Sequence, residues 1–108
     1  MVEISICIVT YQASQYLTDC LHSILESPPG RSFEIIVVDN GSTDGTAEML
    51  RDRFPQVRLI TNLENQGYTR PMNQALRAAA GRYRVQQPGR DGRVRRGLSA
   101  RDFPSGGG

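Results

Sequence analysis

A run of aliphatic residues that ends on a carboxylate constrains the fold of this chain more than any other feature. Residues 33–39 contain four consecutive aliphatic side chains, at 35–38, and stop at Asp39. An uninterrupted run of this length is typical of a strand buried on both faces, which occurs in parallel α/β sheets. Because ligands bind beyond the carboxyl ends of such strands, Asp39 is also a candidate binding residue.

The remaining sequence alternates between strand and helix patterns. Strands are predicted at 4–10, 33–39 and 57–61, with a fourth beginning at Tyr83. Helices are predicted from Ser14 to about residue 27, from Ser42 or Thr43 to about residue 53, and over about 69–80; these Ser and Thr residues serve as N-caps and Gly81 as a C-cap. The pattern predicts an α/β fold: a three-layer α/β/α, Rossmann-like arrangement with a mostly parallel sheet, truncated after the fourth strand.

The last quarter of the chain differs in composition from the rest. Residues 84–108 hold six Arg against two Asp, whereas residues 1–83 hold seven Arg against nine acidic residues. We therefore divide the chain into a domain at 1–83 and an Arg/Gly-rich tail at 84–108. The tail is expected to be disordered or non-native, and an out-of-frame read of GC-rich DNA is one hypothesis for it. Because the basic charge belongs to the tail, no nucleic-acid partner is predicted for the domain.

Several functional classes lack their sequence signatures here. The turn after the first strand has no glycine-rich dinucleotide motif, and the chain has no Lys for a phosphate-binding P-loop. No apolar run reaches the ~20 residues of a membrane helix, and no signal peptide is visible. Cys7 and Cys20 have neither metal nor disulfide spacing and are expected to be buried thiols in a reducing compartment.

Polar residues follow the first two predicted strands at what would be one edge of the sheet. Thr10 and Tyr11 end the first strand, and Tyr11 either stacks on a nucleobase or closes the sheet as a half-buried ring. Asp39 ends the second strand and either accepts a hydrogen bond from a base or ribose or bonds its own turn. Adjacent strand ends of this kind predict one half of a ligand site.

The turn after Asp39 supports two interpretations equally. Asn40, Ser42 and Asp44 precede a predicted helix, where exposed N–H groups can receive an anion. The same residues are also ordinary turn and capping residues. An anion site and a plain helix cap therefore both remain open at this turn.

A polar loop after the third strand completes the predicted site. Gly67 permits a turn with positive φ. Arg70 could pair with a diphosphate and Asn73 could bond a ribose or phosphate, although both also fit a solvated helix surface. His22, the single histidine, falls off the apolar face of its helix and is expected at the surface rather than in catalysis. Three strand ends thus converge on one predicted crevice.

The order and spacing of these motifs resemble the N-terminal half of family 2 glycosyltransferases, which have the GT-A fold. The resemblance covers residues 3–83 and rests on I-C-I-V-T-Y at 6–11, the helix pattern at 17–25, I-V-V-D-N-G-S-T-D-G-T at 36–46, and N-Q-G-Y at 65–68 with Asn73 and Gly81. By analogy, the donor-binding residues are Thr10, Tyr11, Asp39, Asn40, Ser42, Asp44, Gly67, Arg70 and Asn73.

The resemblance implies inverting transfer of a sugar from a nucleotide-diphosphosugar to an unknown glycan or lipid-linked acceptor, in cell-surface polysaccharide synthesis. It also implies a divalent metal, Mg²⁺ or Mn²⁺, and a general base in the later half of the family domain. Asp91 and Asp102 stand alone among Arg and Gly, so no catalytic or metal residue is assigned in this chain. We expect the chain alone to be nearly inactive.

The alternative interpretation is a non-catalytic nucleotide-binding remnant or an interaction module. A cytoplasmic location is expected, at the inner face of the membrane for a full-length parent. No membrane segment is predicted in this chain.

Overall fold

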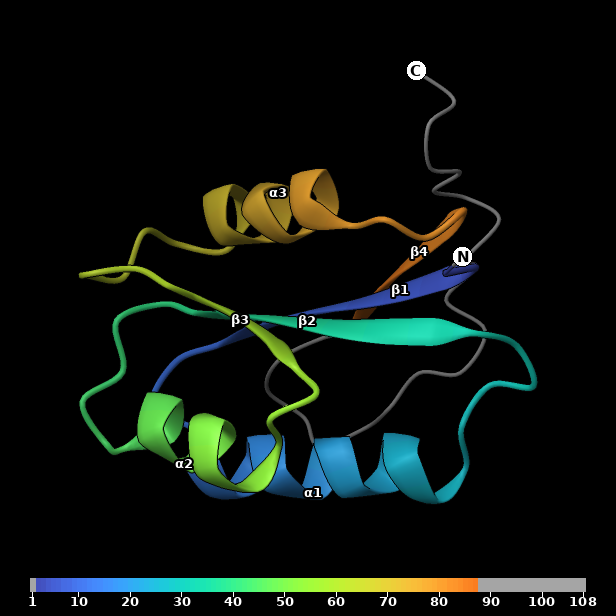
Figure 1. The fold of residues 1–108 in the computed structure, drawn as a ribbon. Coiled ribbons are helices and arrows are strands. Elements are labelled where there is room, and N and C mark those ends of the chain that lie inside the picture. Colours follow the sequence, from blue (N-terminus) through green and yellow to red (C-terminus); the bar gives the residue numbers. More distant parts are fainter. Residues whose placement is uncertain (1, 88–108) are drawn as a thin grey trace.

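The computed structural model describes residues 2–87 of the chain. The elements in chain order are β1 (Ile4–Thr10), α1 (Ser14–Glu26), β2 (Phe33–Asp39), α2 (Thr46–Arg53), β3 (Arg58–Thr61), α3 (Thr69–Ala78) and β4 (Tyr83–Gln87). In this part of the chain the strands form one sheet in the order β3-β2-β1-β4, and all three pairings are parallel. Figure 1 shows α1 and α2 on one face and α3 on the other. The predicted three-layer α/β/α arrangement is confirmed.

Each face of the sheet carries its own hydrophobic core. Alternating residues of β1 and β2, including Ile8 and Val37, pack with α1 and α2 on one face. The intervening residues, including Cys7 and Val38, pack with Met72 of α3 on the other. The aliphatic run of β2 is therefore buried on both sides, as its sequence predicts. Full burial of one such side chain stabilises the fold by roughly 1.5–3 kcal/mol. Because residues 35–38 of β2 are all buried in this way, this strand contributes strongly to the stability of the sheet.

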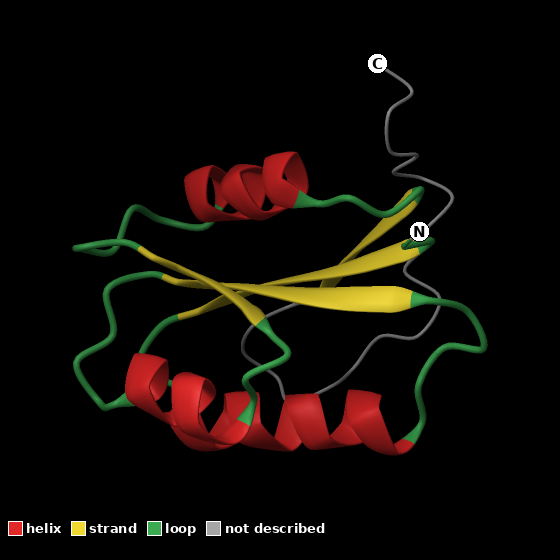
Figure 2. Cartoon of the chain, viewed as in Figure 1, coloured by secondary structure: helices red, strands yellow, loops and turns green. Residues whose placement is uncertain are grey.

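The order of the strands places the loops that matter for function at one edge. The chain runs outward from β1 through β2 to β3, then returns over the sheet through α3 to place β4 on the other side of β1. Figure 2 shows the three layers and the loops that connect them. Since the strands are parallel, the loops after β1, β2 and β3 all leave from the carboxyl edge.

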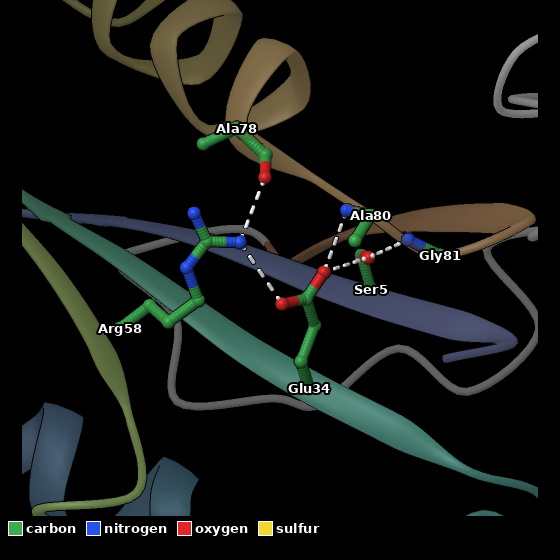
Figure 3. Close-up of polar contacts among 6 residues, drawn as sticks. All are labelled: Ser5, Glu34, Arg58, Ala78, Ala80 and Gly81. Atoms are coloured by element: carbon green, nitrogen blue, oxygen red, sulfur yellow. Dashed lines mark hydrogen bonds and ion pairs between the residues drawn. The ribbon is translucent and has the colours of Figure 1, made fainter. Parts of the chain in front are cut away.

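A polar network at the opposite edge fastens the connection between α3 and β4 to the sheet (Figure 3). Glu34 Oε2 accepts hydrogen bonds from the Ser5 hydroxyl at 2.6 Å and from the Ala80 N–H at 2.7 Å. Ser5 Oγ in turn accepts a hydrogen bond from the Gly81 N–H at 2.8 Å. The backbone leaving α3 is thus tied to both β1 and β2 before it enters β4.

Arg58 of β3 extends this network across the sheet. Its Nη1 donates to Glu34 Oε1 at 3.1 Å and to the Ala78 carbonyl, the end of α3, at 2.8 Å. Burial by itself would raise the pKa of Glu34, but the hydrogen bonds from Ser5, Ala80 and Arg58 outweigh it and hold that pKa below its usual value. The carboxylate is therefore ionised in the folded chain at neutral pH.

The predicted caps of α1 and α2 are wrong. Ser14 is the first residue of α1 rather than its cap, and Ala13 occupies the N-cap position without a side-chain bond. Helix α2 begins at Thr46, with the left-handed Gly45 before it, rather than at Ser42 or Thr43. The capping rules placed the start of α2 too early, because the Ser42 and Thr43 hydroxyl oxygens accept hydrogen bonds from Gln12 in another loop.

The predicted ends of the last elements also need correction. Helix α3 ends at Ala78 with Ala79 at the C-cap, so Gly81 is not its cap. Strand β3 begins at Arg58, one residue later than predicted. Strand β4 continues to Gln87 and pairs with β1, so the first four residues assigned to the tail belong to the sheet. The rest of the predicted tail, from residue 88, lies outside the described residues.

Candidate functional site

A cavity of about 370 Å³ opens at the carboxyl ends of β1 and β2. The residues that line it come from β1, from the turn after β2 and from the loop before α3: Val9, Thr10, Tyr11, Asn40, Asn65, Gly67 and Tyr68. Four of these, Thr10, Tyr11, Asn40 and Gly67, are among the donor-binding residues predicted from the sequence. The cavity lies where an open parallel sheet is expected to bind a ligand.

The end of β1 supplies a buried hydroxyl and an exposed ring. Thr10 pairs in register with Asp39 on β2, so the two predicted residues are neighbours at the edge of the sheet. The Thr10 side chain is only 3% exposed, and its Oγ1 has no hydrogen-bond partner in the described part of the chain. Tyr11, the next residue, is 42% exposed at the cavity. An unpaired buried hydroxyl beside an open aromatic ring can satisfy a polar ligand while the ring stacks on it.

Asn40 holds the far wall of the cavity in place. Its side-chain amide donates to the Gly67 carbonyl at 2.8 Å and to Asn65 Oδ1 at 2.9 Å. Its Oδ1 accepts from the Gln66 N–H at 3.0 Å. Its backbone N–H bonds the Thr10 carbonyl at 2.9 Å. Asn40 is buried, and it ties the loop after β3 to the ends of β1 and β2.

Two glycines let this loop approach the sheet. Gly67 has φ +81°, which confirms the predicted positive-φ turn. Gly41 has φ +89°, and a Cβ there would lie 2.8 Å from the Cα and carbonyl carbon of Glu64. A side chain at position 41 would therefore push the loop away from the turn after β2.

The loop ends in Tyr68, which lines the cavity together with the β1 residues. The side chain is 49% exposed, and partial burial raises the pKa of its hydroxyl above the usual value. The ring therefore remains protonated and neutral at physiological pH. With Tyr11, it gives the cavity two aromatic side chains that water can reach.

Three predicted residues form bonds within the turns instead of lining the cavity. Asp39 Oδ1 accepts from the Ser42 N–H at 3.2 Å. Asp44 Oδ2 accepts from the Ser14 N–H at 3.2 Å, and its Oδ1 accepts from the N–H and hydroxyl of Thr46. Burial would raise the pKa of Asp44, but these hydrogen bonds lower it overall. Asp44 thus bonds the first residue of α2 from the turn before it, while Gly45 occupies the N-cap position.

The remaining predicted residues lie on helix surfaces. Arg70 and Asn73 are exposed on the first turns of α3 and do not line the cavity. His22 is exposed on α1, as predicted, and the edge of its ring meets Phe54 with 5.5 Å between the centroids. The structure therefore brings Tyr11, Gly67 and the turn after Asp39 together, and leaves the two α3 residues outside that cluster.

Three lining residues are absent from the predicted donor set: Val9, Asn65 and Tyr68. Val9 looks like any other core residue of a buried strand, so its residue type does not indicate a place in the cavity lining. Tyr68 does carry one, because an aromatic residue beside a flexible glycine in a polar loop has no core to enter. Asn65 belongs to the same loop, and only its bond with Asn40 reveals its place.

The described residues do not fit a divalent metal. Within residues 2–87 no three His, Cys, Asp or Glu side chains form a group that could hold one. The carboxylates of Asp39, at the end of β2, and of Asp44, in the turn after it, already accept bonds from their own turns. Mg²⁺ and Mn²⁺ prefer several oxygen ligands, so residues 2–87 alone support no catalytic step through a metal.

The chain matches the family model described as Glycosyl transferase family 2 over residues 5–85. It is 32% identical over 87 residues to the Staphylococcus aureus poly(ribitol-phosphate) beta-N-acetylglucosaminyltransferase TarS, a match that covers 77% of this chain and 15% of TarS. It is 37% identical over 68 residues to the Mycobacterium tuberculosis N-acetylglucosaminyl-diphospho-decaprenol L-rhamnosyltransferase, covering 63% of this chain and 22% of that protein. The chain therefore spans less than a third of either relative.

Solved structures show the same fold with nucleotides bound. The crystal structure of S. aureus TarS 1-349 in complex with UDP superposes with a TM-score of 0.70 at 28% identity, over 79% of this chain and 26% of that one. The mannosyltransferase PcManGT from Pyrobaculum calidifontis, in complex with GDP-Man and Mn²⁺, gives 0.67 at 29% identity, over 82% and 29% respectively. The predicted GT-A fold is confirmed by these similarities.

Proposed function

The chain belongs to glycosyl transferase family 2, and from that membership we propose that it forms the part of a glycosyltransferase that binds the nucleotide-diphosphosugar donor. The parent enzyme transfers the sugar with inversion to a glycan or lipid-linked acceptor during synthesis of a cell-surface polysaccharide. The relatives named above are named for poly(ribitol-phosphate) and for N-acetylglucosaminyl-diphospho-decaprenol, which supports this class of acceptor.

The cavity at the ends of β1 and β2 is the observation that carries the proposal. Its aromatic residues, Tyr11 and Tyr68, are accessible, and the unpaired Thr10 hydroxyl lies beside them. A nucleobase is a flat ring with polar edges, so it can stack on an accessible tyrosine and satisfy a buried hydroxyl at once. We therefore assign the base to this cavity, bordered by Thr10 and Tyr11.

The remaining predicted residues take secondary roles in this proposal. Asp39 bonds the base from beside Thr10, its register partner. Asn40 and Gly67 form part of the cavity wall, and Ser42 and Asp44 hold the adjoining turn through their hydrogen bonds. Arg70 and Asn73, exposed on the first turns of α3, are free to meet the diphosphate that extends out of the cavity.

Catalysis itself is not assigned to these residues. Activation of an acceptor hydroxyl needs a positioned base, and neutralisation of a departing diphosphate usually needs a metal. The structural neighbour PcManGT was solved in complex with Mn²⁺, but residues 2–87 of this chain contain no group that fits a divalent metal. We infer that the purified 108-residue chain transfers little or no sugar.

A second candidate is a nucleotide-binding remnant or interaction module without catalysis of its own. The observation that favours it is that residues 2–87 form a cavity but contain no group of three His, Cys, Asp or Glu side chains that could hold a metal. For the parent enzyme we infer a position at the inner face of the membrane, where a lipid-linked acceptor would be presented. No helix within residues 2–87 has the length and apolar character to cross a membrane.

Titration of the purified chain with UDP, dTDP and GDP, with and without Mn²⁺, tests the proposal. We expect weak, metal-independent binding of at least one nucleotide, monitored by calorimetry or NMR. Tyr11→Ala should weaken it about tenfold through lost stacking. Gln56→Ala, an exposed turn residue before β3, is the matched control and should leave affinity unchanged.

Three other outcomes would contradict parts of the proposal. A folded chain that binds none of the three nucleotides would refute donor binding and favour the interaction module. Strong metal-dependent binding would show that the chain holds metal ligands that we have not assigned. Detectable sugar transfer by the chain alone would refute the inferred inactivity.

A further inference from the structure

Gln12 has an unusual backbone for a residue beside the cavity. Its φ is +50°, and it is the one non-glycine residue in the described range with positive φ. Residues other than Gly, Asn and Asp rarely adopt this left-handed backbone conformation, because their Cβ crowds the backbone. Strained residues of this kind are over-represented at binding and catalytic sites, where surrounding contacts hold them. Gln12 directly follows Tyr11, the exposed ring of the cavity.

Contacts from the turn after β2 hold Gln12 in this conformation. Its side-chain Nε2 donates to the Thr43 hydroxyl at 2.9 Å, and its Oε1 accepts from the Thr43 N–H at 2.7 Å. Its backbone N–H donates to Ser42 Oγ at 2.8 Å. Both ends of the Gln12 side-chain amide are thus hydrogen-bonded to Thr43, 31 positions away. The backbone bond to Ser42 also ties Gln12 to the turn after β2.

These bonds connect the loop after β1 with the turn after β2. The Asp44 carboxylate accepts from the Ser14 N–H, so the β1–α1 loop is fixed to the β2–α2 turn at both of its ends. Between these anchors the chain has little freedom to change the direction in which it leaves β1. Tyr11 lies between the end of β1 and these anchors.

We propose that Gln12 is a positioning residue of the nucleotide pocket: its left-handed backbone, held by the paired amide contacts with Thr43, presents the Tyr11 ring to the ligand. This inference rests on the proposed donor-binding function of the cavity. Gln12 itself need not touch the nucleotide. Its contribution is to restrict the Tyr11 ring before the ligand binds, so that less conformational entropy is lost on binding.

A double-mutant cycle on UDP affinity tests the coupling between the two residues. Gln12→Gly keeps a residue that adopts positive φ and removes the Thr43 contacts; we expect it to weaken UDP binding about fivefold. In the Tyr11→Ala background the same change should alter affinity less than about twofold, because no ring remains to be positioned. Equal effects in both backgrounds would overturn the proposal. Gln15→Ala, which removes an exposed α1 amide that donates to Asp19, is the control.

A second measurement needs no nucleotide. The chain has no Trp, so a Tyr11→Trp variant carries a single indole reporter at the cavity. Adding Gln12→Gly should lower its fluorescence anisotropy, whereas Gln12→Glu should preserve it, since a carboxylate can still accept from the N–H and hydroxyl of Thr43. Circular dichroism checks that each variant is folded. Unchanged anisotropy in the glycine variant would overturn the proposal.

The two measurements separate this inference from the proposed function. If the unmodified chain binds no UDP, dTDP or GDP, the donor-binding proposal fails, and the anisotropy alone decides whether Gln12 fixes the ring. If the unmodified chain binds UDP and the cycle shows no coupling, the cavity keeps its proposed ligand and the role of Gln12 is refuted.

Discussion

The side-chain amide of Asn40 donates a hydrogen bond to the backbone carbonyl of Gly67, 2.8 Å away and 27 residues further along the chain. This single contact joins the turn after β2 to the loop that forms the far wall of the cavity. The loop has little apolar burial of its own, since residues 63–70 are all exposed. Its position therefore depends on polar bonds to Asn40 more than on packing.

We predict that Asn40→Asp lowers the free energy of unfolding by about 2–3 kcal/mol, because the new carboxylate faces two acceptors, the Gly67 carbonyl and Asn65 Oδ1. The loss should shrink in acid, where the introduced carboxyl is protonated and can donate again. Urea denaturation at pH 7 and pH 4 measures both effects. Asn73→Ala, an exposed helix position, should change stability by less than about 0.5 kcal/mol. Equal stability of Asn40→Asp and the unmodified chain would contradict the assigned role of the amide.

The contact between Asn40 and Gly67 shows which features the sequence could predict. The four strands, their alternation with helices and the edge at which the site lies all follow from hydrophobic runs and turn residues that are local in sequence. Strands β1 and β2 even begin and end where predicted. The meeting of Tyr11 and Gly67 at one cavity follows from the same logic, because parallel strands end at one edge.

Two of the predictions that failed concern polar side chains with distant partners. Ser42 is a residue type that commonly caps helices, yet its Oγ accepts a hydrogen bond from the backbone N–H of Gln12 in another loop. Arg84 begins the Arg/Gly-rich segment, yet it lies on β4 and pairs with Ser5 of β1. A local pattern cannot reveal a bond that spans 30 residues or more, so the helix starts, the extent of β4 and the role of Gln12 required the structure.

The Glu34 network gives the chain a predicted dependence on acid pH. The pKa of Glu34 is lower in the folded chain than its ordinary value of 4.5, so its contribution to stability is complete above that value. As the pH falls through the depressed folded pKa, Glu34 is protonated and the contribution is lost. Glu34→Gln should remove most of the change in unfolding free energy that Glu34 causes between acid and neutral pH, and it should lower stability at neutral pH.

Urea titrations of both proteins between pH 3 and pH 7 would test this, at about half-unit steps. Asp44, whose pKa is also lowered, remains in both proteins, so the difference between the curves isolates Glu34. Parallel curves would mean that the carboxylate of Glu34 adds no pH-dependent stability. Because Arg58 is half exposed, its ion pair should contribute little, and added salt should leave the difference nearly unchanged.

Three glycine-to-alanine substitutions should differ in a defined order. Gly41→Ala combines positive φ with a 2.8 Å approach to the Glu64 backbone, and should cost about 2 kcal/mol or more. Gly67→Ala has positive φ without a close neighbour, and should cost about 1 kcal/mol. Gly30→Ala has neither and should stay within about 0.5 kcal/mol. Thermal melts rank the three, and a Gly67 cost equal to that of Gly41 would show that the close approach to Glu64 is relieved without penalty.

The two thiols should be unreactive while the chain is folded. Cys7 and Cys20 are both buried and free, as the sequence predicts. Burial raises the pKa of Cys7 to about 12, against a smaller lowering by Arg84, and raises that of Cys20 to about 11. At pH 8 the thiolate is the reactive form, so labelling by a disulfide reagent should be slower than in urea by at least about a hundredfold. Cys7→Ala and Cys20→Ala leave one thiol each and assign the rates; rapid labelling of Cys7 in the folded chain would mean that the core beneath α3 opens far more readily than its packing indicates.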